Sequence, residues 1–148
     1  MHIGAAGLDC PGSLIFGGYD KGRVIGPVIE YNPYTQLRLL DIVVGVEVGD
    51  SHFDFDSRAG LLSAGGQGLS TFTLPQVPYI YLPSEVVQAI VELLPVTMSS
   101  SGGYYLWDTS DDRYTRIISS PAYLGFVFPR TDGPVHNVTI KVQFALLN

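Results

Sequence analysis

The sequence is poor in charged residues, and especially in basic ones. Charged residues make up 15% of the 148 positions, with 8 Lys and Arg against 14 Asp and Glu, so the formal net charge is −6. The basic residues are scattered along the chain and form no stripe. Nucleic-acid binding needs a concentrated basic surface, so this composition argues against a nucleic-acid partner.

Cysteine, histidine and long apolar runs are also scarce. Cys10 is the only cysteine, so no internal disulfide can form. His2, His52 and His136 lie far apart, without the spacing of a metal site, and we expect no metal and no cofactor. No apolar run reaches the roughly 20 residues that a membrane helix needs, and residues 1–7 do not resemble a signal peptide.

Glycine and proline, by contrast, are abundant, with 17 Gly and 10 Pro spread along the chain. The segments between them are rich in Val, Ile, Tyr, Phe and Leu. Such spacing is typical of an all-β domain with many turns. Because the chain has no internal repeat and no linker-like tract, it predicts a single domain over residues 1–148.

The apolar segments predict the positions of the strands. Strands are expected at residues 13–17, 37–48, 52–55, 69–82, 103–107, 114–118, 122–128 and 138–146. Residues 37–48 and 52–55 should form a hairpin with a turn at Gly49, while residues 57–68 should form a surface loop and residues 108–112 a turn.

Residues 84–94 are the single predicted helix. Ser84 can cap the helix, with Glu85 in its first turn, and Pro95 should end it. The helix should pack an apolar stripe on the sheet, made of Val86, Val87, Ile90, Val91 and Leu94.

Two blocks of sequence are distinctive. Residues 12–20 read Gly-Ser-Leu-Ile-Phe-Gly-Gly-Tyr-Asp, and residues 74–83 read Leu-Pro-Gln-Val-Pro-Tyr-Ile-Tyr-Leu-Pro, directly before the predicted helix. Together they resemble the carboxy-terminal lobe of pepsin-like aspartic proteases, especially of the fungal type. The resemblance implies an all-β, pepsin-like half-barrel with one short helix, and a secreted protein. It also implies that this chain ends before the lobe is complete.

The resemblance places a degenerate catalytic site at residues 74–76. In the family, this strand opens with a catalytic Asp followed by two small residues, whereas this chain has Leu74, Pro75 and Gln76. The family mechanism shares one proton between two carboxylates, and the second comes from an amino-terminal lobe that the resemblance does not cover. We therefore expect an aspartic-endopeptidase homologue, a peptidase domain fragment, that is not an active enzyme.

Other candidate sites carry weaker signals. Asp108-Thr109-Ser110 resembles a dyad motif, but further acids follow at once, so a solvated turn is expected. Asp54 and Asp56 could bind a cation, but no third ligand follows at a suitable spacing. Asn137-Val138-Thr139 is a glycosylation sequon beside a Gly-Pro turn.

An alternative function remains open: a non-catalytic pseudoprotease that binds a peptide or protein. Tyr79 and Tyr81 are the candidate binding residues, and Tyr104, Tyr105 and Trp107 would suit the same role. The favoured explanation of these aromatic residues is packing in the core and between strands. Expected partners are a peptide or protein, a complementary lobe, or further copies of the chain joined through strand edges near residues 69–81 or 138–146.

Overall fold

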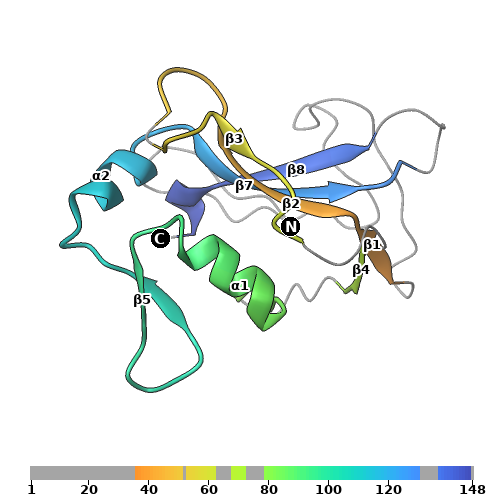
Figure 1. The fold of residues 1–148 in the computed structure, drawn as a ribbon, viewed down its shortest axis with the longest axis horizontal. Helices are drawn as coiled ribbons and strands as arrows, with labels where there is room; N and C mark the ends of the chain where they lie inside the picture. The colour runs from red at the N-terminus through yellow and green to blue at the C-terminus, as the bar shows by residue number, and fades with distance from the viewer. Residues whose placement is uncertain (1–35, 52, 63–67, 73–78, 131–136, 148) are drawn as a thin grey trace, which may run out of the picture. The chain divides into compact units, whose positions relative to one another are not determined.

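The computed structural model describes residues 36–51, 53–62, 68–72, 79–130 and 137–147 (Figure 1). All of them belong to one of the two units into which the chain divides, Tyr31–Asn148, and only that unit is described below. The described residues are mostly strands with two short α-helices, in agreement with the predicted all-β class. The single-domain prediction covers the whole chain and stays a prediction.

The strands form three antiparallel sheets among the described residues. They are β1 (Leu37–Leu39), β2 (Asp41–Val46), β3 (Ser57–Arg58), β4 (Leu69–Thr71), β5 (Val96–Met98), β6 (Tyr105–Trp107), β7 (Ala122–Phe128) and β8 (Val138–Gln143). The sheet orders are β3-β2-β7-β8, β1-β4 and β5-β6. The helices are α1 (Ser84–Val91) and α2 (Asp112–Ile118), and a 3₁₀ turn, η3 (Phe144–Leu146), follows β8 (Figure 1).

One face of the four-stranded sheet carries the core. Ile42 lies opposite Phe126, and Val44 lies opposite Leu124, so alternate side chains of β2 and β7 point to the same side. Val86 and Ile90 of α1 and Leu94, three residues beyond its end, are buried at a spacing of four residues, which confirms these three members of the predicted apolar stripe. The other two, Val87 and Val91, are half-buried and do not belong to the core cluster. The buried core cluster comprises Leu39, Ile42, Val44, Leu61, Leu62, Val86, Ile90, Leu94, Ile117, Ala122, Leu124 and Phe144.

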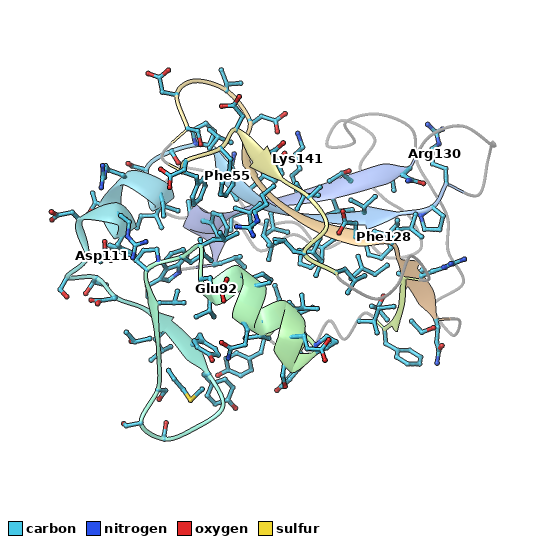
Figure 2. The ribbon with its side chains drawn as sticks, viewed as in Figure 1. Phe55, Glu92, Asp111, Phe128, Arg130 and Lys141 are labelled. Carbon is cyan, nitrogen blue, oxygen red and sulfur yellow. The ribbon has the colours of Figure 1, made fainter. Side chains whose placement is uncertain are left out.

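On the opposite face of the sheet, the ring of Tyr123 lies over Gly45. Tyr123 lies opposite Gly45 in the register of β2 and β7. A Cβ atom at Gly45 would lie 2.9 Å from the Tyr123 hydroxyl, so only glycine leaves room for this ring. The Lys141 ammonium lies 4.6 Å from the ring centroid and pairs with Glu47. Lys141 is labelled in Figure 2. The hydrogen bond to Glu47 raises the pKa of Lys141.

The predicted hairpin exists, but its return strand is displaced. Gly49 adopts φ +89° in the loop between the two strands, a conformation that favours glycine. Pairing starts where the Val46 N–H donates to the Asp56 carbonyl, so β3 is Ser57–Arg58 and not residues 52–55. Phe53 and Phe55 instead stack on each other within the loop, with ring centroids 5.1 Å apart.

The prediction of a surface loop over residues 57–68 is wrong in its first half. Leu61 and Leu62 are buried. The Asp41 carboxylate holds this segment, because its Oδ2 accepts from the Gly60 N–H at 2.8 Å and its Oδ1 accepts from the Leu62 N–H at 3.4 Å. A carboxylate that anchors a loop leaves no periodic signal in the sequence.

Residues 114–118 form part of a second helix, so both the predicted strand and the single-helix prediction are wrong. Asp111 caps this helix, since its Oδ1 accepts from the Arg113 N–H at 2.8 Å. The β-branched and aromatic content of residues 114–118 favours a strand. The cap and the burial of Ile117 in the core outweigh that weak preference.

The predicted strand 37–48 divides at Leu40 into β1 and β2, which belong to different sheets, and the sequence did not predict β5. The other differences lie at the ends of elements. The N-cap of α1 is Pro83 with no side-chain cap bond, so Ser84 is the first helical residue and not the cap, and the helix ends at Val91. The predicted strand 69–82 is β4 at its start and is not a strand at residues 79–82. The last strand ends at Gln143 and continues as η3.

Two further statements concern only the described part of the chain. Neither of its α-helices is long and apolar enough to cross a membrane. The predicted strand at residues 13–17 lies outside the described residues.

Candidate functional site: an aromatic groove

A groove of about 920 Å³ lies between α1 and the β5-β6 hairpin. The segment 79–82, which leads into α1, forms a third side. Leu124 of β7, Phe144 and residues 146–147 also line it. We call this feature the aromatic groove, because all five aromatic residues singled out in the sequence, Tyr79, Tyr81, Tyr104, Tyr105 and Trp107, line it.

Three of these aromatic residues face solvent. The exposed fractions are 53% for Tyr79, 68% for Tyr81 and 42% for Tyr104. The rings of Tyr79 and Tyr104 contact each other with centroids 4.7 Å apart, tilted by 35°. Packing in the core, which is one part of the favoured explanation of these residues, is wrong for all three.

Exposed apolar side chains gather at this groove. Of the ten large hydrophobic residues exposed in the described part, seven line the groove. These seven are Tyr79, Ile80, Tyr81, Met98, Tyr104, Leu106 and Leu146. The other three, Val48, Phe72 and Ile140, do not. Scattered apolar residues are normal on a protein surface, whereas a cluster of them marks a surface that binds something.

Trp107 fixes one side of the groove to the rest of the protein. Its Nε1–H donates to the Leu147 carbonyl at 3.0 Å. Its ring meets Phe144 edge-on and Tyr114 at a tilt, each with centroids 5.8 Å apart. Since Phe144 is a core residue and Tyr114 belongs to α2, these contacts hold β6 in place.

The hairpin owes its shape to two glycines. Gly102 and Gly103 adopt φ +84° and +92°, which other residues rarely adopt. The Ser99 N–H donates to the Tyr104 carbonyl at 2.8 Å and closes the turn. Met98 lies opposite Tyr105 in the β5-β6 register, and both side chains line the groove.

A side-chain hydrogen bond connects the helix and hairpin sides. The Gln88 Nε2–H of α1 donates to the Tyr105 hydroxyl of β6 at 3.3 Å. The Tyr105 oxygen accepts this bond, so its own O–H can still donate to a ligand.

The groove is neutral, but its surroundings are acidic. None of the described residues that line it carries a carboxylate, ammonium, guanidinium, imidazole or thiol, so they offer aromatic faces, hydroxyls and amides. Glu85 and Glu92 are exposed and directly adjoin lining residues of α1, and Glu92 is labelled in Figure 2. From position 59 to position 112, the sequence contains no Lys, Arg or His.

The acidic cluster at residues 108–112 is built into local structure. Asp108 Oδ1 accepts from the Ser110 hydroxyl and from the Ser110 N–H, and these bonds lower the pKa of Asp108. Asp111 accepts three hydrogen bonds from the Arg113 guanidinium and one from its backbone N–H, which together lower the pKa of Asp111 to about 2. The prediction of a turn is confirmed at residues 109–111, and the α2 helix begins directly after it.

The other predicted site residues stay apart from the groove or outside the described residues. Leu74, Pro75 and Gln76, the positions of the degenerate catalytic site, lie outside the described residues. Asp54 and Asp56 are exposed, and within the described part no three metal-ligating side chains come together. Asn137 is exposed directly before β8, and its glycosylation stays a prediction.

Sequence reasoning missed the aliphatic and polar members of the groove. Ile80, Met98, Leu106, Leu146 and Gln88 all line it. One signal in the sequence could have identified the hairpin members. Apolar, uncharged residues on both sides of Gly102-Gly103 predict a hairpin, and without charged side chains such a hairpin presents an apolar surface to a partner.

Comparisons of this chain with protein-family models, with curated proteins and with solved structures found no match. The functional argument therefore depends on the groove and on the sequence.

Proposed function

We propose that this chain is a non-catalytic binding module whose aromatic groove holds a segment of a peptide or protein partner. The observation that carries this proposal is the gathering of seven of the ten exposed large hydrophobic residues around one groove. Removing such a surface from water is favourable by about 25 cal/mol for each Å² buried, before the costs of association.

The chemistry of the groove suits a polypeptide. Tyrosine and tryptophan combine a large apolar face with a polar tip, and they are enriched among the residues that dominate binding at protein interfaces. A polypeptide segment offers apolar side chains for the rings and backbone carbonyls for the hydroxyls. The groove has both kinds of group, at Tyr81 and Leu106 for burial and at Tyr105 and Ser101 for hydrogen bonding.

We also propose that the chain is a degenerate homologue of the carboxy-terminal lobe of pepsin-like endopeptidases, with the half-barrel fold and secretion that this implies. The proposal is supported by the two sequence blocks at residues 12–20 and 74–83. A pseudoprotease that keeps binding and loses cleavage would unite both proposals, because Leu74 stands where the family has its acid.

The loss of catalysis can be tested directly. We expect the purified chain to cleave no denatured protein between pH 2 and 7 and to bind no pepstatin. Leu74→Asp alone should restore nothing, because one carboxylate cannot form a pair that shares a proton. Pepstatin-sensitive cleavage by pure protein would contradict the proposal, and a mass-spectrometric search for new termini would detect it.

Binding can be tested with displayed random peptides and a built-in reporter. Trp107 is the only tryptophan and lines the groove, so its fluorescence should change when a selected peptide binds. Tyr81→Ala and Leu106→Ser should weaken binding, because both side chains are exposed in the groove. Phe72→Ala is the matched control, since Phe72 is equally exposed and lies outside the groove.

Two outcomes would contradict the binding proposal. One is a selection that enriches no peptide above background. The other is a set of peptides whose affinity falls as much with Phe72→Ala as with Tyr81→Ala, because those peptides would bind somewhere else.

A further inference from the structure

Aromatic rings line the groove on two of its sides, at residues 79–81 and on the β5-β6 hairpin. The rings of Tyr79 and Tyr104 contact each other at a tilt of 35°. Tyr81, two residues after Tyr79 in the sequence, is 68% exposed. Grooves lined by aromatic rings are the usual receptors of proline-rich segments in the polyproline II conformation. The pyrrolidine rings of such segments pack on aromatic faces, and the preformed helix loses little entropy on binding.

The polar groups of the groove match the backbone of such a segment. The Tyr105 hydroxyl accepts from Gln88 and so keeps its proton for a ligand. Ser99 and Ser101 share a hydrogen bond of 2.9 Å between their hydroxyls, which uses one of their two protons and leaves the other for a ligand. A polyproline II segment has no internal hydrogen bonds, so its carbonyls need donors. Its prolines have no N–H and therefore need no acceptor.

Charge narrows the class of partner further. The described residues that line the groove are uncharged, so a charged side chain buried there would lose water without gaining a counter-ion. Around it, Glu85 and Glu92 are exposed, and no Lys, Arg or His occurs from position 59 to 112. The next basic residue, Arg113 of α2, is paired with Asp111. The matching partner has an uncharged centre and basic ends.

Resting on the proposed function, we infer that the aromatic groove binds a proline-rich segment in the polyproline II conformation that is flanked by Lys or Arg. Rings supply the contacts to proline, hydroxyls supply the donors for its carbonyls, and the acidic surroundings select basic flanks.

The test compares three synthetic peptides of equal length by Trp107 fluorescence and by calorimetry on the full chain. The first is a run of eight prolines with two lysines at each end. The second has the same prolines with glutamates at each end. The third keeps the lysines and replaces the prolines by alternating Thr and Val, which favours a β-strand.

We expect the lysine-flanked proline peptide to bind at least about fivefold more tightly than either of the others, which corresponds to a difference near 1 kcal/mol. The advantage over the glutamate-flanked peptide should shrink at about 0.5 M salt, because screening weakens exposed charges. Tyr104→Ala should weaken binding by at least about fivefold as well, while Phe72→Ala should leave it unchanged.

Each other outcome overturns the inference. The outcomes differ in whether they also contradict the proposed function. If the Thr-Val peptide binds best, the ligand is a strand: the inference is wrong and the proposed function stands. If displayed random peptides bind at the groove but proline peptides do not, the result is the same. If no peptide of any kind binds, both fail.

Two further experiments test other possible occupants of the groove: sedimentation of the protein alone, and binding of an oligosaccharide. A dimer that Tyr104→Ala dissociates and Phe72→Ala does not would show that a second copy fills the groove. Binding of cellohexaose with a Trp107 response, in the absence of peptide binding, would show a carbohydrate site. Either result contradicts a proline-rich ligand.

Discussion

The sheet core and the aromatic groove contain similar apolar residues, but these are buried in the core and exposed in the groove. Ile42 and Val44 of β2 are 0% exposed, whereas Met98 at the end of β5 is 61% exposed and Leu106 of β6 is 57% exposed. All four are apolar residues of antiparallel strands. What differs is the surroundings, since the sheet residues are enclosed by α1, α2 and η3 in one core cluster, and the hairpin residues border open space.

Strand length adds to this difference. The pairing of β2 with β7 extends over six residue pairs, and that of β7 with β8 over six more. The β5-β6 hairpin has three pairs and no further strand among the described residues. A two-stranded hairpin is marginal in water by itself, so this one depends on Trp107 and its contacts to Phe144 and Leu147.

The largest effect should come from a cavity in the sheet core. Ile42→Ala should reduce the free energy of unfolding by about 2–5 kcal/mol, because Ile42 is fully buried and its methyl groups lose their contacts. Leu106→Ala, in the groove, should change it by less than about 0.5 kcal/mol. Urea titration followed by circular dichroism measures both. Equal losses in the two variants would mean that the groove is part of the core.

The helix α1 lies between the two regions and provides a sharper comparison. Ile90→Ala should cost about 2–3 kcal/mol, since Ile90 is 8% exposed and belongs to the core cluster. Gln88→Ala, two residues away on the exposed side, should change stability little and instead remove the hydrogen bond to Tyr105. A loss below about 1 kcal/mol for Ile90→Ala would show that α1 packs loosely.

The sequence predicted well where periodicity reports burial. The 122–128 strand appears with the predicted bounds, because a short apolar run between turn residues is typical of a buried strand. Val86, Ile90 and Leu94 pack as expected, because a helical spacing of apolar residues follows from one buried face. The α2 helix was missed because its formation depends on the Asp111 cap and on the core contact of Ile117. The aromatic residues of the groove were identified, but their exposure depends on what packs nearby, which no local pattern records.

A smaller effect is expected on the far face of the sheet. Gly45→Ala should destabilise by about 1–2 kcal/mol, because the new methyl group would lie 2.9 Å from the Tyr123 hydroxyl and 3.1 Å from the Ser57 Cβ. Adding Tyr123→Ala should make Gly45→Ala less costly than it is in the wild type, since the obstructing ring is gone. A double-mutant cycle in urea measures this coupling. Strict additivity would mean that the ring does not lie over Gly45.

The smallest effect concerns pH and the helix that supports the groove. The Arg113 side chain and N–H lower the pKa of Asp111 to about 2, below the value of 3.8 for a free carboxyl. A depressed pKa in the folded state means that Asp111 stabilises the protein above about pH 4, and that this contribution disappears as the pH falls to 2. The side chains of Asp111 and Arg113 are partly exposed, so we expect the stability to change only slightly.

Asp111→Asn should flatten the decline of the urea midpoint between pH 4.5 and 2 relative to the wild type, and Asp112→Asn, the neighbouring acid, should flatten it less. Because Tyr114 of α2 contacts Trp107, the fluorescence emission of Trp107 should change over the same pH range, between 4.5 and 2. If Asp112→Asn flattened the decline more than Asp111→Asn, the ion pair with Arg113 would not be its source, and α2 would support the groove through the burial of Ile117 alone.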